Sequence, residues 1–160
     1  MEPNPSHITR LIRLREHYEQ KFGSRVEIVH AMATTYTGNA TFFPNPEYGG
    51  GAQNHEWTGG SIQRHKRQVP VNVPAIDLND ILSRYTWTRS VMKMDIEGSE
   101  VDLLPHIEAR LCHITKLYIE VHNTEARNVL HNVKRRLIAR RCPVSIVELD
   151  DETPCAILDH

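Results

Sequence analysis

Two short stretches of the chain each read as a buried strand that ends in ionisable side chains. Asp95 and Glu97 end the first strand, and Glu120 and His122 end the second. Parallel sheets collect functional groups at the carboxyl ends of neighbouring strands, where ligands bind in a crevice. We therefore expect these four side chains to converge at one edge of a sheet and to form a site.

The residue types at this edge suit proton transfer and ligand positioning. A carboxylate or an imidazole can remove a proton from a hydroxyl group. Carboxylate oxygens with a histidine nitrogen also suit Mg²⁺ or Mn²⁺, but we expect Glu97, Glu120 and His122 to act on a substrate without a metal. The plainer alternative for His122 is a strand-end histidine bonded to a nearby carboxylate. Gly98 fits a tight strand-to-helix turn, and Glu100 is expected only to stabilise the first turn of the following helix.

The elements that must position these groups alternate between strands and helices. Asn4 and Pro5 predict the start of a helix and Gly23 predicts its end. The alternation favours an α/β fold with a mostly parallel sheet, helices on both faces and a C-terminal antiparallel hairpin. The expected strands are 25–33, 40–43, 69–73, 90–96, 115–121, 144–149 and 156–158, and the later helices are 77–82, 99–111 and 124–140.

Two segments stand apart from this order. Residues 44–68 are rich in proline and glycine, and we interpret them as a loop or hairpin insertion in a single domain that spans 1–160. A disordered excursion is the alternative. The basic residues between 134 and 141 could bind phosphate, although a solvated helix end whose cations are favoured by the dipole is the simpler interpretation.

Composition narrows the functional classes. The net charge is −1 and the pI is about 6.8, so nothing demands nucleic acid or an anionic membrane as a partner. No apolar run approaches the roughly 20 residues of a membrane span. The chain begins without the basic and apolar regions of a signal peptide. Cys112, Cys142 and Cys155 are widely spaced and odd in number, which predicts no structural zinc site and favours reduced cysteines in a cytoplasmic protein.

The motifs, taken in order, resemble those of the FkbM-type methyltransferases. Residues 93–100 (KMDIEGSE) are similar to the family pattern of Lys, an aliphatic residue, Asp, an aliphatic residue, Glu, Gly, a small residue and Glu. Residues 78–82 and 117–122 are similar to two further segments of the family, and residues 2–5 (EPNP) are similar to its segment after the second strand. The resemblance covers nearly the whole chain and is weakest over 44–68.

The resemblance implies a Rossmann-like class I methyltransferase that uses S-adenosyl-L-methionine. It implies O-methylation of a hydroxyl on a sugar, a glycan or another small metabolite. It assigns catalysis to Asp95, Glu97, Glu120 and His122, with Asp95 facing either the amino acid end of the cofactor or the acceptor. It also implies that Glu2 accepts the ribose hydroxyls of the cofactor. Within this set, we expect Asp95 and Glu97 to matter most for activity.

The chain departs from the family at its start. The family has a first strand and a glycine-rich cofactor loop before the segment that matches residues 2–5, and the given sequence begins one residue before Glu2. The resemblance therefore implies a domain that lacks its first strand, which would need a complementing N-terminal segment or self-association. A non-catalytic remnant or subunit that binds through its acidic sheet edge remains the alternative. A metal-dependent hydrolase is disfavoured because Glu-x-His alone is a poor metal motif.

Overall fold

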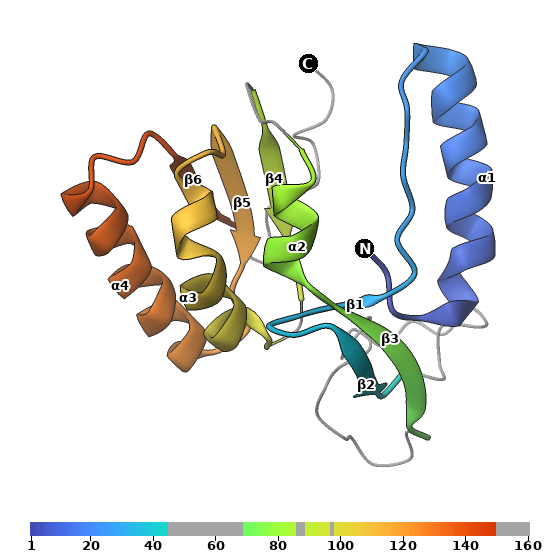
Figure 1. Cartoon of the computed structure of the whole chain (residues 1–160), viewed down its shortest axis with the longest axis horizontal. Helices are drawn as coiled ribbons and strands as arrows, with labels where there is room; N and C mark the ends of the chain where they lie inside the picture. Colours follow the sequence, from blue (N-terminus) through green and yellow to red (C-terminus); the bar gives the residue numbers. More distant parts are fainter. Residues whose placement is uncertain (45–68, 86–88, 97, 150–160) are drawn as a thin grey trace. The chain divides into compact units, whose positions relative to one another are not determined.

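The structure is a computed structural model that describes residues 1–44, 69–85, 89–96 and 98–149. The chain forms two compact units, Met1–Asp77 and Leu78–His160. Figure 1 labels the elements of both units. The predicted insertion at 44–68 and the predicted strand at 156–158 lie outside the described residues, apart from Pro44.

In the first unit, helix α1 (Pro5–Phe22) follows the sequence prediction at both ends. The side chain of Asn4 caps the helix, because its Oδ1 accepts a hydrogen bond from the Ser6 backbone N–H at 3.1 Å. Gly23 ends the helix in the left-handed conformation at φ 63°, which glycine adopts without the steric cost of a Cβ atom. The predicted caps are confirmed.

The sheet of the first unit contains β1 (Met32–Thr34), β2 (Gly38–Phe42) and β3 (Val71–Asp77). Strand β3 lies in the centre, parallel to β1 and antiparallel to β2. Pro74 has no backbone N–H to donate to a neighbouring strand. It is tolerated within β3 because β1 pairs with β3 only from Ala75 onward, so β1 requires no hydrogen bond from position 74. The strand predicted at 69–73 is observed as β3, which begins later and ends later, at Val71 and Asp77.

The predicted strand 25–33 is wrong for most of its length. Only its last two residues belong to β1. Further back, the Val26 N–H donates to Glu19 Oε1 at 2.9 Å, and the Val29 carbonyl accepts from the Glu2 N–H at 3.0 Å. These backbone groups are satisfied by single contacts around α1 rather than by a strand ladder. Apolar alternation cannot distinguish the two arrangements.

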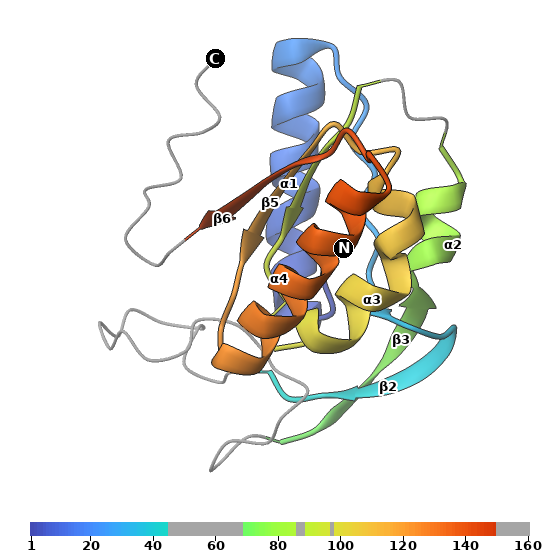
Figure 2. The same ribbon diagram turned by 90° about the vertical axis from the view of Figure 1, so that its left-hand side faces the viewer.

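The second unit holds a three-stranded parallel sheet in the order β4-β5-β6, formed by Val91–Met94, Lys116–Glu120 and Ser145–Leu149. Helices α2 (Leu78–Ser83), α3 (Glu100–Leu111) and α4 (Thr124–Ala139) alternate with these strands. Figures 1 and 2 show α3 and α4 side by side on one face of this sheet. Each of these elements was predicted, with boundaries that differ by one to a few residues.

Apolar side chains at helical and strand spacing form the core of the second unit. Helix α3 packs against α4 and both helices turn their buried side chains inward. The fully or almost fully buried residues are Leu103, Leu104, Ile107 and Leu111 of α3, Leu117 and Ile119 of β5, and Leu130, Val133 and Leu137 of α4. This packing fixes the carboxyl ends of β4 and β5 beside the start of α3.

A disulfide joins Cys112, directly after α3, to Cys142, in the turn before β6. Their Cα atoms lie 4.8 Å apart across a sequence separation of 30 residues. The expectation of reduced cysteines is therefore wrong for this pair, because spacing along the sequence does not reveal which helix ends meet. Cys155 lies outside the described residues. The cytoplasmic setting, which rested partly on reduced cysteines, stays a prediction.

Candidate active site

The carboxyl ends of β4 and β5 bring three of the four predicted side chains together. Met94 is paired with Ile119 in the parallel register, so the residues that follow each strand are neighbours. One ligand atom each from Asp95, Glu120 and His122 lies within 4.8 Å of the others. The fourth, Glu97, lies outside the described residues.

Gly98 forms the turn between this strand end and α3. Its φ is +97°, a conformation that side chains with a Cβ atom rarely adopt. The turn brings the chain back so that the first residue of α3 lies against the strand ends. This geometry agrees with the structural role that the sequence predicts for Gly98.

Lys93 belongs to the cluster, although the sequence did not single it out. Its Nζ lies 2.8 Å from Glu120 Oε1 and 3.2 Å from Asp95 Oδ2. Burial by itself would lower the pKa of Lys93, but the hydrogen bonds and charges of Glu120 and Asp95 outweigh it and raise this pKa above its ordinary value of 10.5. A signal was present, because residues two apart on a strand share a face and Lys93 precedes Asp95 by two.

Glu100 lies in the first turn of α3, as the sequence predicted, and makes a further contact that the sequence did not predict. The sequence predicted only a helix N-terminal acid that interacts with the dipole, but its carboxylate is completely buried. Glu100 Oε1 lies 3.0 Å from His122 Nδ1. Glu100 Oε2 has no hydrogen-bond partner in the described part of the chain. The plainer expectation for His122, a strand-end histidine bonded to a carboxylate, is confirmed.

His122 lies between two carboxylates of different exposure. Its Nδ1 faces the buried Glu100, and its Nε2 lies 3.6 Å from Asp95 Oδ1. The side chain of His122 is 17% exposed and that of Asp95 is 36% exposed. His122 and Asp95 are therefore partly open to solvent, whereas the buried Glu100 contacts this cluster through His122.

The same cluster offers the ligand types of a divalent cation site. Asp95, Glu120 and His122 supply two carboxylates and one imidazole. The ammonium group of Lys93 already bridges the two carboxylates, so a cation would have to displace it. We therefore assign these carboxylates to Lys93, and the absence of a catalytic metal stays a prediction.

Glu2, the predicted ribose ligand, lies in the first unit at the start of α1. Its Oε1 accepts a hydrogen bond from the Asn4 backbone N–H at 2.8 Å, and its Oε2 lies 3.5 Å from His7 Nδ1. A carboxylate oxygen can accept more than one hydrogen bond, so these contacts leave acceptor capacity for hydroxyl groups. The chemistry of Glu2 therefore fits a ribose, and the role stays a prediction.

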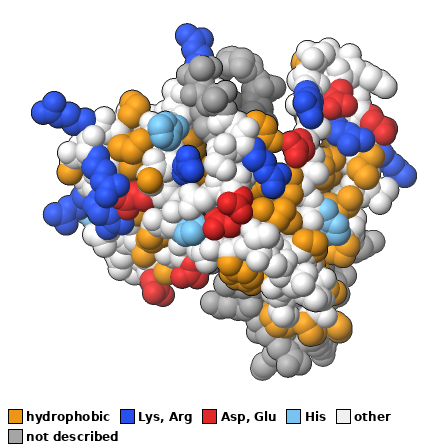
Figure 3. Space-filling model, in the orientation of Figure 1, with side chains coloured by type: hydrophobic (Ala, Val, Ile, Leu, Met, Phe, Trp, Pro, Cys, Tyr) orange, Lys and Arg blue, Asp and Glu red, His pale blue; other side chains and the backbone are white. Residues whose placement is uncertain are grey.

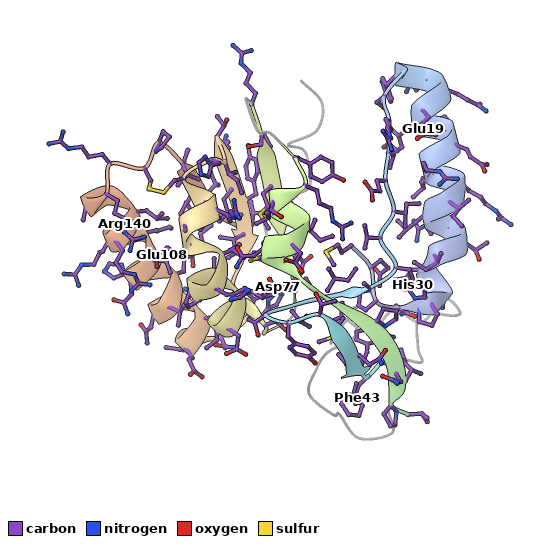
Figure 4. All side chains as sticks on the ribbon, viewed as in Figure 1. Glu19, His30, Phe43, Asp77, Glu108 and Arg140 are labelled. Atoms are coloured by element: carbon purple, nitrogen blue, oxygen red, sulfur yellow. A yellow bond between two sulfur atoms is a disulfide. The ribbon has the colours of Figure 1, made fainter. Side chains whose placement is uncertain are left out.

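The basic end of α4 is partly neutralised by acids of the same unit. In Figure 3, Lys and Arg side chains gather over the last turns of α4. Arg136 Nη2 lies 2.7 Å from Glu108 Oε2, and Arg140 Nη1 lies 3.1 Å from Glu108 Oε1. Figure 4 labels Glu108 of α3 and Arg140, the residue after α4, close to one another. These two arginines support the packing of α3 on α4, which weakens the phosphate interpretation.

In the parts of the chain that the structure describes, no helix combines the length and the apolar character needed to cross a membrane.

Comparison with known proteins identifies the family. A family model of the methyltransferase FkbM domain matches residues 1–149. No curated protein and no solved structure matches the chain significantly. The family match spans most of the 160 residues and includes the strand ends that carry the cluster. The chain therefore belongs to the FkbM methyltransferase domain family.

Proposed function

We propose that this protein transfers a methyl group from S-adenosyl-L-methionine to a hydroxyl oxygen of a sugar or another small metabolite. The observation that carries the proposal is the convergence of Asp95, Glu120 and His122 at the carboxyl ends of two parallel strands. This is the edge of an α/β sheet at which ligands bind. The membership in a methyltransferase family supplies the reaction class.

The chemistry of the cluster suits an oxygen acceptor. When bound, the cofactor would supply an electrophilic methyl group. A hydroxyl oxygen must lose its proton during transfer, and an imidazole or a carboxylate can take it. The ammonium group of Lys93 bridges the carboxylates of Asp95 and Glu120 and so restricts their orientation. Oriented groups of this kind lower the entropic part of the barrier.

The individual roles follow from position. Glu120 and His122 would contact the acceptor, and Asp95 would contact either the acceptor or the amino acid end of the cofactor. Glu97 is proposed for the same edge on its sequence position alone. The contact of Glu2 with the ribose is proposed from the family resemblance and from the chemistry of its carboxylate.

The test measures transfer of an isotopically labelled methyl group to a panel of sugars and small hydroxyl compounds, with products identified by mass spectrometry. We expect Asp95→Asn to lower the rate by about 10²-fold, the scale of a lost acid–base or orienting group. Asp102→Asn is the matched control, because Asp102 is exposed in the first turn of α3 and its replacement removes the same charge. Equal rates for the two variants would contradict the assignment of Asp95.

A specific observation favours a second candidate, a subunit that needs a partner segment. Helix α1 has no buried residue, and its large apolar side chains Ile12, Leu14, Tyr18 and Phe22 are exposed. Either a complementing N-terminal segment or a second copy could cover such side chains. Sedimentation velocity would show whether the purified chain is a monomer, and calorimetry would show whether it binds S-adenosyl-L-methionine unaided. A monomer that binds the cofactor unaided would exclude the need for a partner.

A further inference from the structure

Among the described acids of the cluster, the buried carboxylate of Glu100 is the one that no ligand can touch directly. Glu100 is the first residue of α3 and His122 follows β5 by two residues, so their contact joins two elements at the sheet edge. Glu100 is completely buried, and the Oε1–Nδ1 distance is 3.0 Å. A charge in this position is retained only where it is paired or hydrogen-bonded.

The contact links the protonation of Glu100 to the nitrogen of His122 that carries the proton. An ionised Glu100 only accepts hydrogen bonds, so Nδ1 of His122 is the donor whenever Glu100 is ionised. In the neutral ring, the lone pair then lies on Nε2, the nitrogen that faces Asp95 Oδ1 at 3.6 Å. The tautomer that places the lone pair on the Asp95 side is therefore the one that an ionised Glu100 would select.

We propose that Glu100 is a positioning residue that holds His122 with its proton on Nδ1, so that Nε2 of His122 takes the proton of the acceptor hydroxyl. The proposal rests on the proposed methyl transfer to oxygen. In this step, the acceptor O–H bond breaks and a new N–H bond forms at Nε2. The oxygen uses its electron pair to form the new bond to the methyl carbon, and the donor leaves as its neutral thioether. The proton on His122 then passes to solvent.

The protonated ring that this step produces would face a carboxylate on each side. The imidazolium would donate through Nδ1 to Glu100 and point its Nε2–H toward Asp95, 3.6 Å away. Glu100 Oε2 has no hydrogen-bond partner among the described residues, so the carboxylate depends on His122 for its pairing. In the low dielectric of a buried site, such a pairing is stronger than in water.

A structural tether and a protonated Glu100 are the two alternatives to this positioning role, and each makes a different prediction. A tether between α3 and the end of β5 would stabilise the fold without any requirement for a particular tautomer. A protonated Glu100 would donate to Nδ1 and leave the ring proton on Nε2, the opposite tautomer. The protonation state of the two ring nitrogens of His122 therefore separates a protonated Glu100 from the proposal, and a kinetic comparison separates the tether.

The first experiment needs no change in the site. Nitrogen-15 NMR of the uniformly labelled protein, with the His122 signals assigned by their loss in His122→Gln, reports the protonation of each ring nitrogen. We expect the neutral ring to carry its proton on Nδ1. A neutral ring protonated on Nε2, or a ring that stays doubly protonated at the pH of activity, would overturn the proposal. This readout does not depend on methyl transfer, so it separates a failure of this inference from a failure of the proposed function.

The second experiment compares two buried glutamates of the same helix. Glu100→Gln keeps the size of the side chain but removes its charge, and we expect kcat to fall about 10²-fold while the KM of the acceptor changes less than about twofold. Glu108→Gln is the control, because Glu108 is buried in α3 but pairs with Arg136 and Arg140. Both variants are compared at a temperature where each is folded by circular dichroism. Equal kcat values for the two variants, or a Glu100→Gln effect confined to KM, would overturn the proposal.

Discussion

Removal of the disulfide between Cys112 and Cys142 should destabilise the protein by a predictable amount. The bond closes a loop with a sequence separation of 30 residues. In the chain-entropy description, a cross-link over such a loop lowers the conformational entropy of the unfolded state. This raises the unfolding free energy by about 3.6 kcal/mol at 25 °C. Both cysteines are half-buried, so replacement by alanine removes little packing in comparison. The Cys112→Ala/Cys142→Ala variant should therefore lose about 3.6 kcal/mol of unfolding free energy.

The assay is urea unfolding followed by circular dichroism, with the wild-type protein kept free of reductant. For an ordinary urea dependence of roughly 1–3 kcal/mol per molar, the midpoint should fall by roughly 1–4 M. Cys155→Ala is the matched control, because it removes one cysteine outside the disulfide. Titration of the unfolded wild-type protein should detect one free thiol. Three free thiols, or a double variant as stable as the Cys155→Ala control, would refute the reasoning.

Two further predictions concern ion pairs of the second unit. Glu108→Gln should lower the urea midpoint by roughly 0.5 M, because the buried Glu108 pairs with Arg136 and Arg140. Glu125→Gln is the control, and it should leave the midpoint nearly unchanged because Glu125 is exposed in the first turn of α4. Equal midpoints for the two variants would contradict this prediction. The raised pKa of Lys93 implies that its charge stabilises the fold fully below its unfolded pKa of 10.5, and that this stabilisation is lost as the pH rises through the higher folded value. The test compares the unfolding free energies of the wild type and of Lys93→Met. Their difference should be constant at neutral pH and should shrink above about pH 10.5. A difference that stays constant at high pH would show that the pairing does not depend on the charge.

The sequence predicted those features that depend on local chemistry. Asn4 and Gly23 define the ends of α1 because a cap is a local interaction. Asp95, Glu120 and His122 converge because parallel strands place their carboxyl ends at one edge. Both predictions need only the identity of the residues and the type of the element that holds them.

The contacts that the sequence did not predict depend on packing between distant segments. The role of Glu100 follows from the turn at Gly98, which moves the start of α3 against the end of β5. Its sequence position alone is typical of a helix N-terminal acid. The strand expected at 25–33 failed for the same reason, since a strand exists only where another strand offers backbone partners, and the neighbours of Val26 and Val29 are Glu19 and Glu2.

Helix α3 is fixed at both ends by contacts of different chemistry. Glu100 holds its first residue to His122, and the disulfide at Cys112 follows its last residue. The 12 residues of the helix span about 18 Å, and Pro105 lies inside the helix. Because Pro105 has no backbone N–H, it interrupts the hydrogen-bond ladder of the helix, and a displacement at the cysteine end would be absorbed most easily at this turn. The contact with His122 and the covalent bond of Cys112 therefore anchor two ends of α3 that lie a full helix length apart, with the proline between them.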